Sequence, residues 1–164
     1  MELPKNLDIG CGPWKKKGFF GIDCRTFWEG ENPDKNLKVD ADLIHDLNDG
    51  IPFPENTIEE IYASHFMEHV SNIYFMLDEC YRVLKEGGLL DIVVPLYEMH
   101  PVDHVTCFYP DWFERNISND GARYTKRFKI SKKSIKLVEL PEEHRAFWEL
   151  KIRLVKEWLV LFAT

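Results

Sequence analysis

Short apolar segments recur along the chain between polar or glycine-containing turns, and their lengths are typical of strands in a layered α/β fold. Gly10 ends the first segment and Pro95 ends the fifth, as expected where buried strands stop. The predicted strands are Lys5 to Ile9, Phe19 to Ile22, Asp42 to Leu47, Ile58 to Ser64 and Leu89 to Val94.

One helix is clearly indicated between the fourth and fifth of these strands. Ser71 or Asn72 is a suitable N-cap, and Gly87 follows the end of the helix. Apolar residues recur at helical spacing along one face, namely Ile73, Met76, Leu77, Cys80, Tyr81 and Leu84. Apolar strands separated by a capped helix predict a mostly parallel sheet.

The connection between the first two strands is unusually short. Only the residues from Cys11 to Gly18 separate them. A parallel crossover that contains a helix needs about a dozen residues. We therefore expect the first helix of this sheet to be shortened or missing. The polar segment from Arg25 to Lys38 is expected to be a surface connection.

The C-terminal third changes character. Leu96 to Gly121 contains prolines and many aromatic residues and is expected to form a lid, with a short helix from Pro110 to Asn116. Tyr124 to Val138 and Trp148 to Phe162 are typical of a closing antiparallel hairpin. The pattern leaves open whether Glu142 to Glu149, between them, form a helical turn.

Composition limits the size and the partners of the protein. With 164 residues, 45% of them hydrophobic, we expect one domain over residues 1–164. A formal net charge of -7 and a pI of about 5.4 disfavour nucleic acid, whose binding requires clustered positive charge. Small molecules are the expected partners, and a protein partner or a second copy of the chain is compatible with the sequence.

Cysteine spacing and the N-terminal sequence indicate a cellular compartment. Cys11, Cys24, Cys80 and Cys107 lie far apart, and MELPKN lacks the basic and apolar regions of a signal peptide. Reduced thiols in the cytoplasm are expected. Because no apolar run is long enough to span a bilayer, we expect no membrane insertion.

The stretch LDIGCGPWKKKGFFGID, from Leu7 to Asp23, contains the strongest chemical signal. Gly10 and Gly12 permit a sharp turn and a close approach of the backbone to a ligand. Asp23, at the end of the second strand, can accept hydrogen bonds from two ribose hydroxyls. This pattern predicts a nucleoside site, although a simple tight turn after a strand explains the glycines equally well.

The order of these motifs resembles the class I S-adenosylmethionine-dependent methyltransferases, in particular the small type 11-like branch with a shortened first helix. LDIGCG is similar to the first motif of the family, and GID, ending at Asp23, is similar to its second. HDLNDGIPFPENTIEEIYASHFMEH resembles the adenine-contacting loop and fourth strand, and YRVLKEGGLLDIVVP resembles the next helix and strand. The resemblance implies a Rossmann-like α/β fold with a mostly parallel sheet and a C-terminal antiparallel hairpin.

The resemblance also implies which residues bind S-adenosyl-L-methionine. Asp8 steadies the glycine loop, whose backbone lies against the methionine part, and Asp23 binds the ribose. Asp46 receives the adenine amino group and Leu47 packs on the base, and the alternative for Asp46 is an acidic cap on a turn. The implied cofactor residues are Asp8, Gly10, Cys11, Gly12, Asp23, Asp46, Leu47, Ser64 and His65.

Two departures from the family pattern bear on cofactor affinity. Trp14 stands where the family often has a third glycine, and the missing helix removes a positive dipole end near the methionine carboxylate. Lys15, Lys16 or Lys17 can replace that dipole by direct charge pairing, or all three can be solvated.

Histidines are the candidates for proton transfer to and from an acceptor, because an imidazole titrates near neutral pH. We favour His104 and then His65 as catalytic residues, whereas His69 is expected to bond to backbone. His100, Asp103 and His104 are spaced like metal ligands but lack a fourth member, so no metal is expected. The other candidate bases are Glu98, His100 and Asp103.

The sequence thus favours a methyltransferase that acts on a small molecule, with a non-catalytic or partner-dependent cofactor-binding protein of the same fold as the alternative. The residues after the fourth strand, Ser64 to Met67, lack the Pro-Pro-Tyr sequence of base-methylating enzymes. A nicotinamide-dependent oxidoreductase would have glycine at position 15, which is Lys15. The seven basic residues between Arg123 and Lys136 are interpreted as a solvated edge hairpin or an anion-binding stripe.

Overall fold

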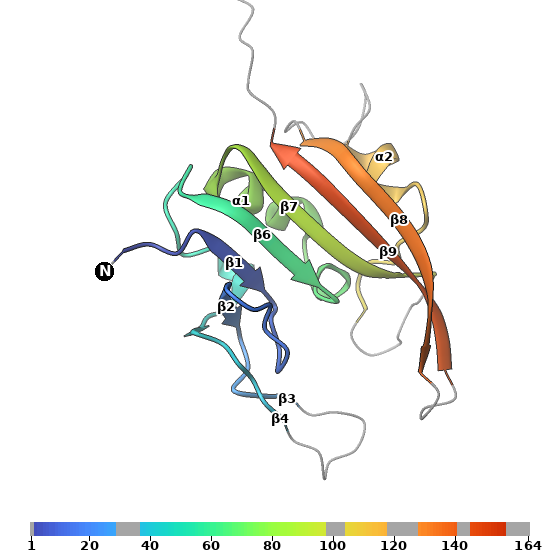
Figure 1. Ribbon diagram of the computed structural model, residues 1–164, viewed down its shortest axis with the longest axis horizontal. Coiled ribbons are helices and arrows are strands. Elements are labelled where there is room, and N and C mark those ends of the chain that lie inside the picture. The colour runs from blue at the N-terminus through green and yellow to red at the C-terminus, as the bar shows by residue number, and fades with distance from the viewer. Residues whose placement is uncertain (1, 29–36, 98–103, 118–127, 141–144, 157–164) are drawn as a thin grey trace, which may run out of the picture.

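The centre of the molecule is a seven-stranded sheet with the order β5-β2-β1-β6-β7-β9-β8 (Figure 1). The computed structural model describes residues 2–28, 37–97, 104–117, 128–140 and 145–156. The first five strands in this order are parallel, and β9 runs antiparallel to both of its neighbours. The strands are β1 (Asn6–Ile9), β2 (Phe20–Asp23), β5 (Leu43–Ile44), β6 (Ile58–Ser64), β7 (Leu84–Leu96), β8 (Phe128–Leu140) and β9 (Arg145–Lys156).

Helices α1 (Ile73–Val83) and α2 (Trp112–Ile117) lie on the same side of the sheet, behind it in Figure 1. Two single turns of 3-10 helix, η2 (Leu47–Asp49) and η3 (Met67–His69), follow strands β5 and β6. A separate two-stranded ribbon pairs β3 (Phe27–Trp28) with β4 (Leu37–Lys38). Both α-helices of the described residues therefore cover one face.

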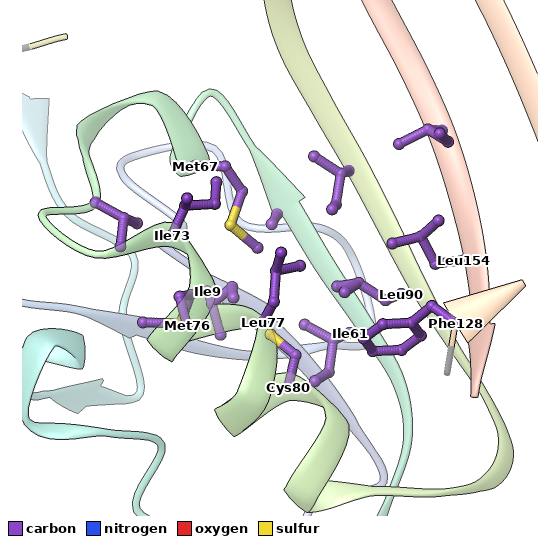
Figure 2. Packing of buried hydrophobic residues seen from close by; sticks show 14 of the residues in the cluster. Ile9, Ile61, Met67, Ile73, Met76, Leu77, Cys80, Leu90, Phe128 and Leu154 are labelled. Carbon is purple, nitrogen blue, oxygen red and sulfur yellow. The ribbon is translucent and has the colours of Figure 1, made fainter. Parts of the chain in front are cut away.

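The core forms between α1 and the strands, as Figure 2 shows. Asn72 caps the helix by accepting a hydrogen bond from the Phe75 N–H at 3.1 Å. The buried side of α1 then places Leu77 and Cys80 against the sheet near Ile61. Burial of this apolar stripe is the main stabilising contribution to the fold.

The opposite face of the sheet carries polar residues. A row of paired positions crosses the strands from Asp8 through Tyr62, Asp91 and Arg153 to Lys132. Arg153 binds Asp91 through two hydrogen bonds of 2.6 Å. Both α-helices of the described residues lie on the other face of the sheet and do not cover this row.

The structure confirms the predicted mostly parallel sheet, the closing hairpin and the missing first helix. No helix forms between β1 and β2. Residues 10–19 instead fold over the polar face, where Lys16 Nζ lies 4.0 Å from the Phe19 ring centre and 4.6 Å from that of Tyr62. The N-cap at Asn72 and the strand Ile58–Ser64 are also as predicted.

Three predicted elements differ from the structure. The third strand shrinks to Leu43–Ile44 because Asp46 caps η2 and turns the chain. The fifth begins at Leu84 instead of Leu89, because Leu84 pairs with Ile58 and its carbonyl accepts a bond from buried Lys156. The lid helix begins at Trp112.

The sequence left open whether Glu142 to Glu149 form a helical turn, and in the structure the described part of this stretch is a strand. Residues 145–149 belong to β9 because all of them pair with β8, and Trp148 and Glu149 also pair with β7. The two-stranded ribbon β3-β4 was not predicted within the polar connection. None of the helices in the described part of the chain has the length and apolarity to cross a membrane.

Candidate functional site

The glycine bend after β1 lies at the carboxyl ends of the parallel strands. The N–H groups of Gly10 and Cys11 both donate to the Ile22 carbonyl, at 2.8 and 3.3 Å, which folds the bend back onto β2. Gly10 and Gly12 have φ values of +66° and +54°, in the left-handed region that favours glycine. The bend therefore requires the residues that the sequence analysis singled out.

The two glycines have different surroundings. A Cβ at Gly10 would lie 2.3 Å from the Phe66 side chain, so the protein itself fills that side of the bend. A Cβ at Gly12 would meet no described atom within 4 Å. A ligand can therefore approach the backbone at Gly12 but not at Gly10.

Asp23 closes the bend from the end of β2. Its Oδ2 accepts a hydrogen bond from the Gly12 N–H at 3.0 Å, and its Oδ1 accepts one from the Arg25 N–H at 3.0 Å. The predicted ribose-binding carboxylate is thus held directly beside the open glycine. Each carboxylate oxygen has a second acceptor site that a hydroxyl can use.

Asp8 lies beneath the loop and is 2% exposed. Its Oδ2 accepts a hydrogen bond from the Lys16 N–H at 2.6 Å, which holds the loop on the sheet. Burial raises the pKa of Asp8 to about 6, although the Lys16 N–H and charge oppose the rise. This geometry is what the role of steadying the loop requires.

Lys15 and Lys16 are committed to carboxylates of the chain. Lys15 Nζ lies 2.9 Å from Asp42 and 3.4 Å from Asp40, and Lys16 Nζ lies 2.9 Å from Glu60. Neither interpretation of these two lysines, as partners of a methionine carboxylate or as solvated charges, matches this arrangement. Their role is to attach the irregular loop to the sheet.

Cys11 is buried under the same loop and its Sγ lies 3.7 Å from the Asp40 carbonyl. Burial raises the pKa of the thiol to about 12, and the Asp8 charge adds to the rise. The thiol is therefore neutral at physiological pH. Cys11 contributes its backbone to the bend and no nucleophile.

Asp46 and Leu47 follow β5 at the same edge of the sheet as Asp23. Asp46 Oδ1 accepts bonds from the Asn48 N–H at 2.9 Å and from the Asn48 side chain at 3.0 Å, so Asp46 is an N-cap. Leu47 is 4% exposed and belongs to the hydrophobic core. Its side chain offers little surface to an adenine, and the adenine contacts of both residues stay predictions.

Ser64 ends β6, and His65 follows it with a φ of +50°. The His65 imidazole lies between two buried acids, with Nε2 3.2 Å from Glu149 Oε2 and Nδ1 3.5 Å from Glu68 Oε1. The hydrogen bond to Glu68 and the two negative charges raise the pKa of His65. Because these acids favour the imidazolium form, His65 is less available as a base than an isolated imidazole.

His104, the first choice for a catalytic base, lies beside His69 rather than beside His65. The ring centres of His69 and His104 are 4.9 Å apart and the rings cross at 75°. The other lid candidates, Glu98, His100 and Asp103, lie outside the described residues. The catalytic roles of His104 and His65 stay predictions.

Three residues of this region were not identified from the sequence: Phe66, Glu68 and Glu149. Glu68 lies three residues after His65, a spacing that brings side chains together in a helical turn, so a local signal existed. Glu149 comes from β9, 84 residues away from His65. Only the pairing of β9 with β7 reveals that contact.

Residues 26–92 match the model of a family described as a methyltransferase domain. Many solved structures also match the chain, and several of them carry methyltransferase names. The chain has the fold of the class I S-adenosylmethionine-dependent methyltransferases. No curated protein matches the sequence.

Two solved structures illustrate the methyltransferase fold. An S-adenosylmethionine-dependent methyltransferase from Methanosarcina mazei is 18% identical, with a TM-score of 0.58, and 93% of this chain and 92% of that chain are covered. One from Aquifex aeolicus is 17% identical, with a TM-score of 0.51 and coverage of 92% and 81%.

A third structure contains a protein partner. It is the complex of the Haloferax volcanii Trm112 methyltransferase activator with a candidate methyltransferase. The match is 15% identical with a TM-score of 0.62, and it covers 96% of this chain and 85% of that chain. At these identities the likeness establishes the fold alone.

Proposed function

We propose that this protein is an S-adenosylmethionine-dependent methyltransferase that methylates a small-molecule acceptor. The observation that carries the proposal is the open backbone at Gly12 beside a carboxylate that is already oriented by the Gly12 N–H. This arrangement offers a ribose two acceptor oxygens and offers the adjoining part of the cofactor a close backbone approach. The residues present therefore fit an adenosyl group.

S-adenosylmethionine supplies a methyl group that is already activated by a positively charged sulfur. The protein then has to bind and orient both reactants and exclude water. In this proposal Asp23 and the glycine bend bind the adenosyl group. Ser64 lies beside the bend, at the end of β6, which is the neighbour of β1 in the sheet. Glu68 and Glu149 are buried acids at that strand end and favour a cationic ligand there.

A small acceptor agrees with the charge of the chain, because a net charge of -7 opposes binding of nucleic acid. For an acceptor that must lose a proton, His104 is the predicted base. We further propose that residues 1–164 act as one cytoplasmic domain. Cys11, Cys24, Cys80 and Cys107 are all free thiols, as expected in a reducing compartment.

Calorimetric titration with S-adenosylhomocysteine tests cofactor binding directly. Asp23→Asn should weaken binding about 10- to 100-fold, since hydrogen bonds to a charged group contribute about 1.5 to 3 kcal/mol. Asp49→Asn is the control, because it removes an exposed charge from the neighbouring turn η2. Absence of binding to the unmodified chain, or equal binding by the Asp23→Asn variant, would refute the proposal.

The alternative is a cofactor-binding subunit that requires a protein partner for activity. The specific observation in its favour is the match to a complex that contains a methyltransferase activator. Incubation of the purified chain with methyl-labelled cofactor and broad pools of small molecules distinguishes an active methyltransferase from a partner-dependent subunit. Cofactor binding without label transfer to any pool supports the partner-dependent subunit.

A further inference from the structure

Glu68, His69 and His104 form a cluster of potential metal ligands next to the proposed cofactor site. Glu68 and His69 belong to η3, the turn that follows β6, and His104 comes from the lid segment. One ligand atom from each residue can be chosen so that all three lie within 4.8 Å of one another. The sequence analysis considered His104 only with His100 and Asp103 and therefore expected no metal.

Backbone hydrogen bonds hold the two halves of this cluster together. The Glu68 carbonyl accepts bonds from the N–H groups of Val105, at 2.7 Å, and Thr106, at 3.1 Å. The His69 N–H donates to the Phe66 carbonyl at 3.0 Å, which closes the turn. The backbone positions of the two segments that carry the three ligands are thus fixed relative to each other by the fold.

The Glu68 carboxylate supplies independent evidence for a ligand. Glu68 is 1% exposed, and within the described part of the chain its Oε2 has no hydrogen-bond partner. Its Oε1 lies 3.5 Å from His65 Nδ1. A buried carboxylate oxygen without a partner is costly, and buried charges in proteins are normally paired or bound to a metal.

We propose that Glu68, His69 and His104 bind a divalent transition-metal ion, for which Zn²⁺ is the best match. Two imidazole nitrogens and one carboxylate oxygen are the protein ligands of many zinc sites with an open fourth position. Mg²⁺ and Ca²⁺ prefer oxygen ligands and do not suit two imidazoles. The metal would satisfy Glu68 Oε2 and attach the lid segment to η3.

Metal binding requires only small side-chain movements. Ligand atoms about 2.0 to 2.1 Å from a tetrahedral zinc ion lie roughly 3.4 Å apart, so separations of up to 4.8 Å must shorten by at most about 1.4 Å. His69 is exposed and can rotate without disturbing the core. A coordinated His104 has no free lone pair on that nitrogen, so the metal site replaces its predicted role as a base.

The test is titration of the chelator-treated full chain with Zn²⁺ by calorimetry, and with Co²⁺ by visible absorption, without cofactor. One ion per chain should bind. Glu68→Gln and His104→Gln should each weaken binding more than about 100-fold, beyond the range typical of outer-shell residues. Glu149→Gln is the matched control, because Glu149 is also a buried acid beside His65 but lies outside the cluster, and binding should be nearly unchanged.

Two further measurements separate this site from binding by thiols or from misfolding. A Cys24→Ser, Cys107→Ser double variant should retain the ion, and Zn²⁺ should slow hydrogen exchange at the Val105 and Thr106 amides. If Glu68→Gln does not fold, the Zn²⁺ affinities of His69→Ala and His104→Gln decide between a metal site and its absence. Absence of one-to-one binding, equal affinity in these variants, or loss of the ion with the thiols overturns the proposal. None of these outcomes depends on methyl transfer.

Discussion

Two neighbouring rows of residues cross the same sheet and have opposite chemistry. The first row, on the helix-covered face, is Phe20, Leu7, Ile61, Leu90, Leu154 and Ile130. The second, one residue further along each of the first four strands, is Gly21, Asp8, Tyr62, Asp91, Arg153 and Lys132. Leu7, Ile61, Leu90 and Leu154 are 0% exposed, whereas the second row is largely charged.

This difference shows how the chain manages without its first helix. In a sheet covered on both faces, strands read as continuous apolar runs. Here the apolar residues of the first row alternate with the polar residues of the second, and residues 10–19 cover the Asp8 end of the charged row. The polar row makes the face that the described helices leave uncovered compatible with water.

The largest effect is expected from the covered row. Leu90→Ala removes a fully buried side chain from the contact between the sheet and α1. The free energy of unfolding should fall by about 3 kcal/mol, from lost burial and the cavity that remains. Urea denaturation measures the change, and a loss below about 1 kcal/mol would contradict a tightly packed covered face.

A smaller, pH-dependent effect is expected at Asp8, the buried acid of the charged row. Its folded pKa of about 6 is above its usual value of 3.8, so the charged form is disfavoured in the folded state. Acidification from pH 7 to pH 4 should therefore stabilise the protein relative to Asp8→Asn, by about 2 kcal/mol. Below pH 4 the unfolded chain is protonated too, and no further gain follows.

Unfolding measured for both proteins across this pH range checks the prediction. The comparison with Asp8→Asn is internally controlled. The other carboxylates titrate equally in both proteins, so their contributions cancel in the difference between the two free energies of unfolding. A difference that stays flat between pH 7 and pH 4 would show that Asp8 is charged at little cost in the folded protein.

Next in size is the ion pair of Asp91 with Arg153. Both side chains are partly solvent-accessible, so the pair should contribute only about 0.5 to 1 kcal/mol. A double-mutant cycle with Asp91→Asn and Arg153→Met measures the coupling. Raised salt should reduce it, and a coupling above about 2 kcal/mol would mean that this face is shielded from water in solution.

The smallest effect is expected at Lys132, the exposed end of the charged row. Lys132→Gln should change the free energy of unfolding by less than about 0.5 kcal/mol, as is usual for surface substitutions. Thermal unfolding of the variant and of the unmodified chain, measured side by side, gives this change. A clear stabilisation would indicate that repulsion among the lysines of β8 limits stability.

The parallel core of the fold was predictable because its signals are local. Asn72 at the start of an apolar stripe fixed the place of α1, and the short interval between Ile9 and Phe19 excluded a crossover helix. The limits of β7 and β9 were not predictable in this way. Leu84 joins β7 through Ile58 and Lys156, and residues 145–149 join β9 through partners on two strands, all of which are distant in sequence.

The site was predictable to a similar degree. Gly12 and Asp23 were identified because a glycine bend after one strand and a carboxylate at the end of the next form a local pattern, and the structure places the two residues in direct contact. The pairing of Lys15 with Asp40 and Asp42 was not foreseen, since it depends on the path of an irregular loop. The Glu68, His69 and His104 cluster likewise joins two separate segments.

The packing of Phe66 on Gly10 joins the two proposed sites mechanically. Phe66 begins the turn that carries Glu68 and His69, and the same ring fills the space that a Cβ at Gly10 would need. Any shift of the bend on nucleoside binding must therefore push on this ring and reposition the turn. Occupancy of one site would then alter affinity at the other, a thermodynamic coupling that the contact alone is sufficient to transmit.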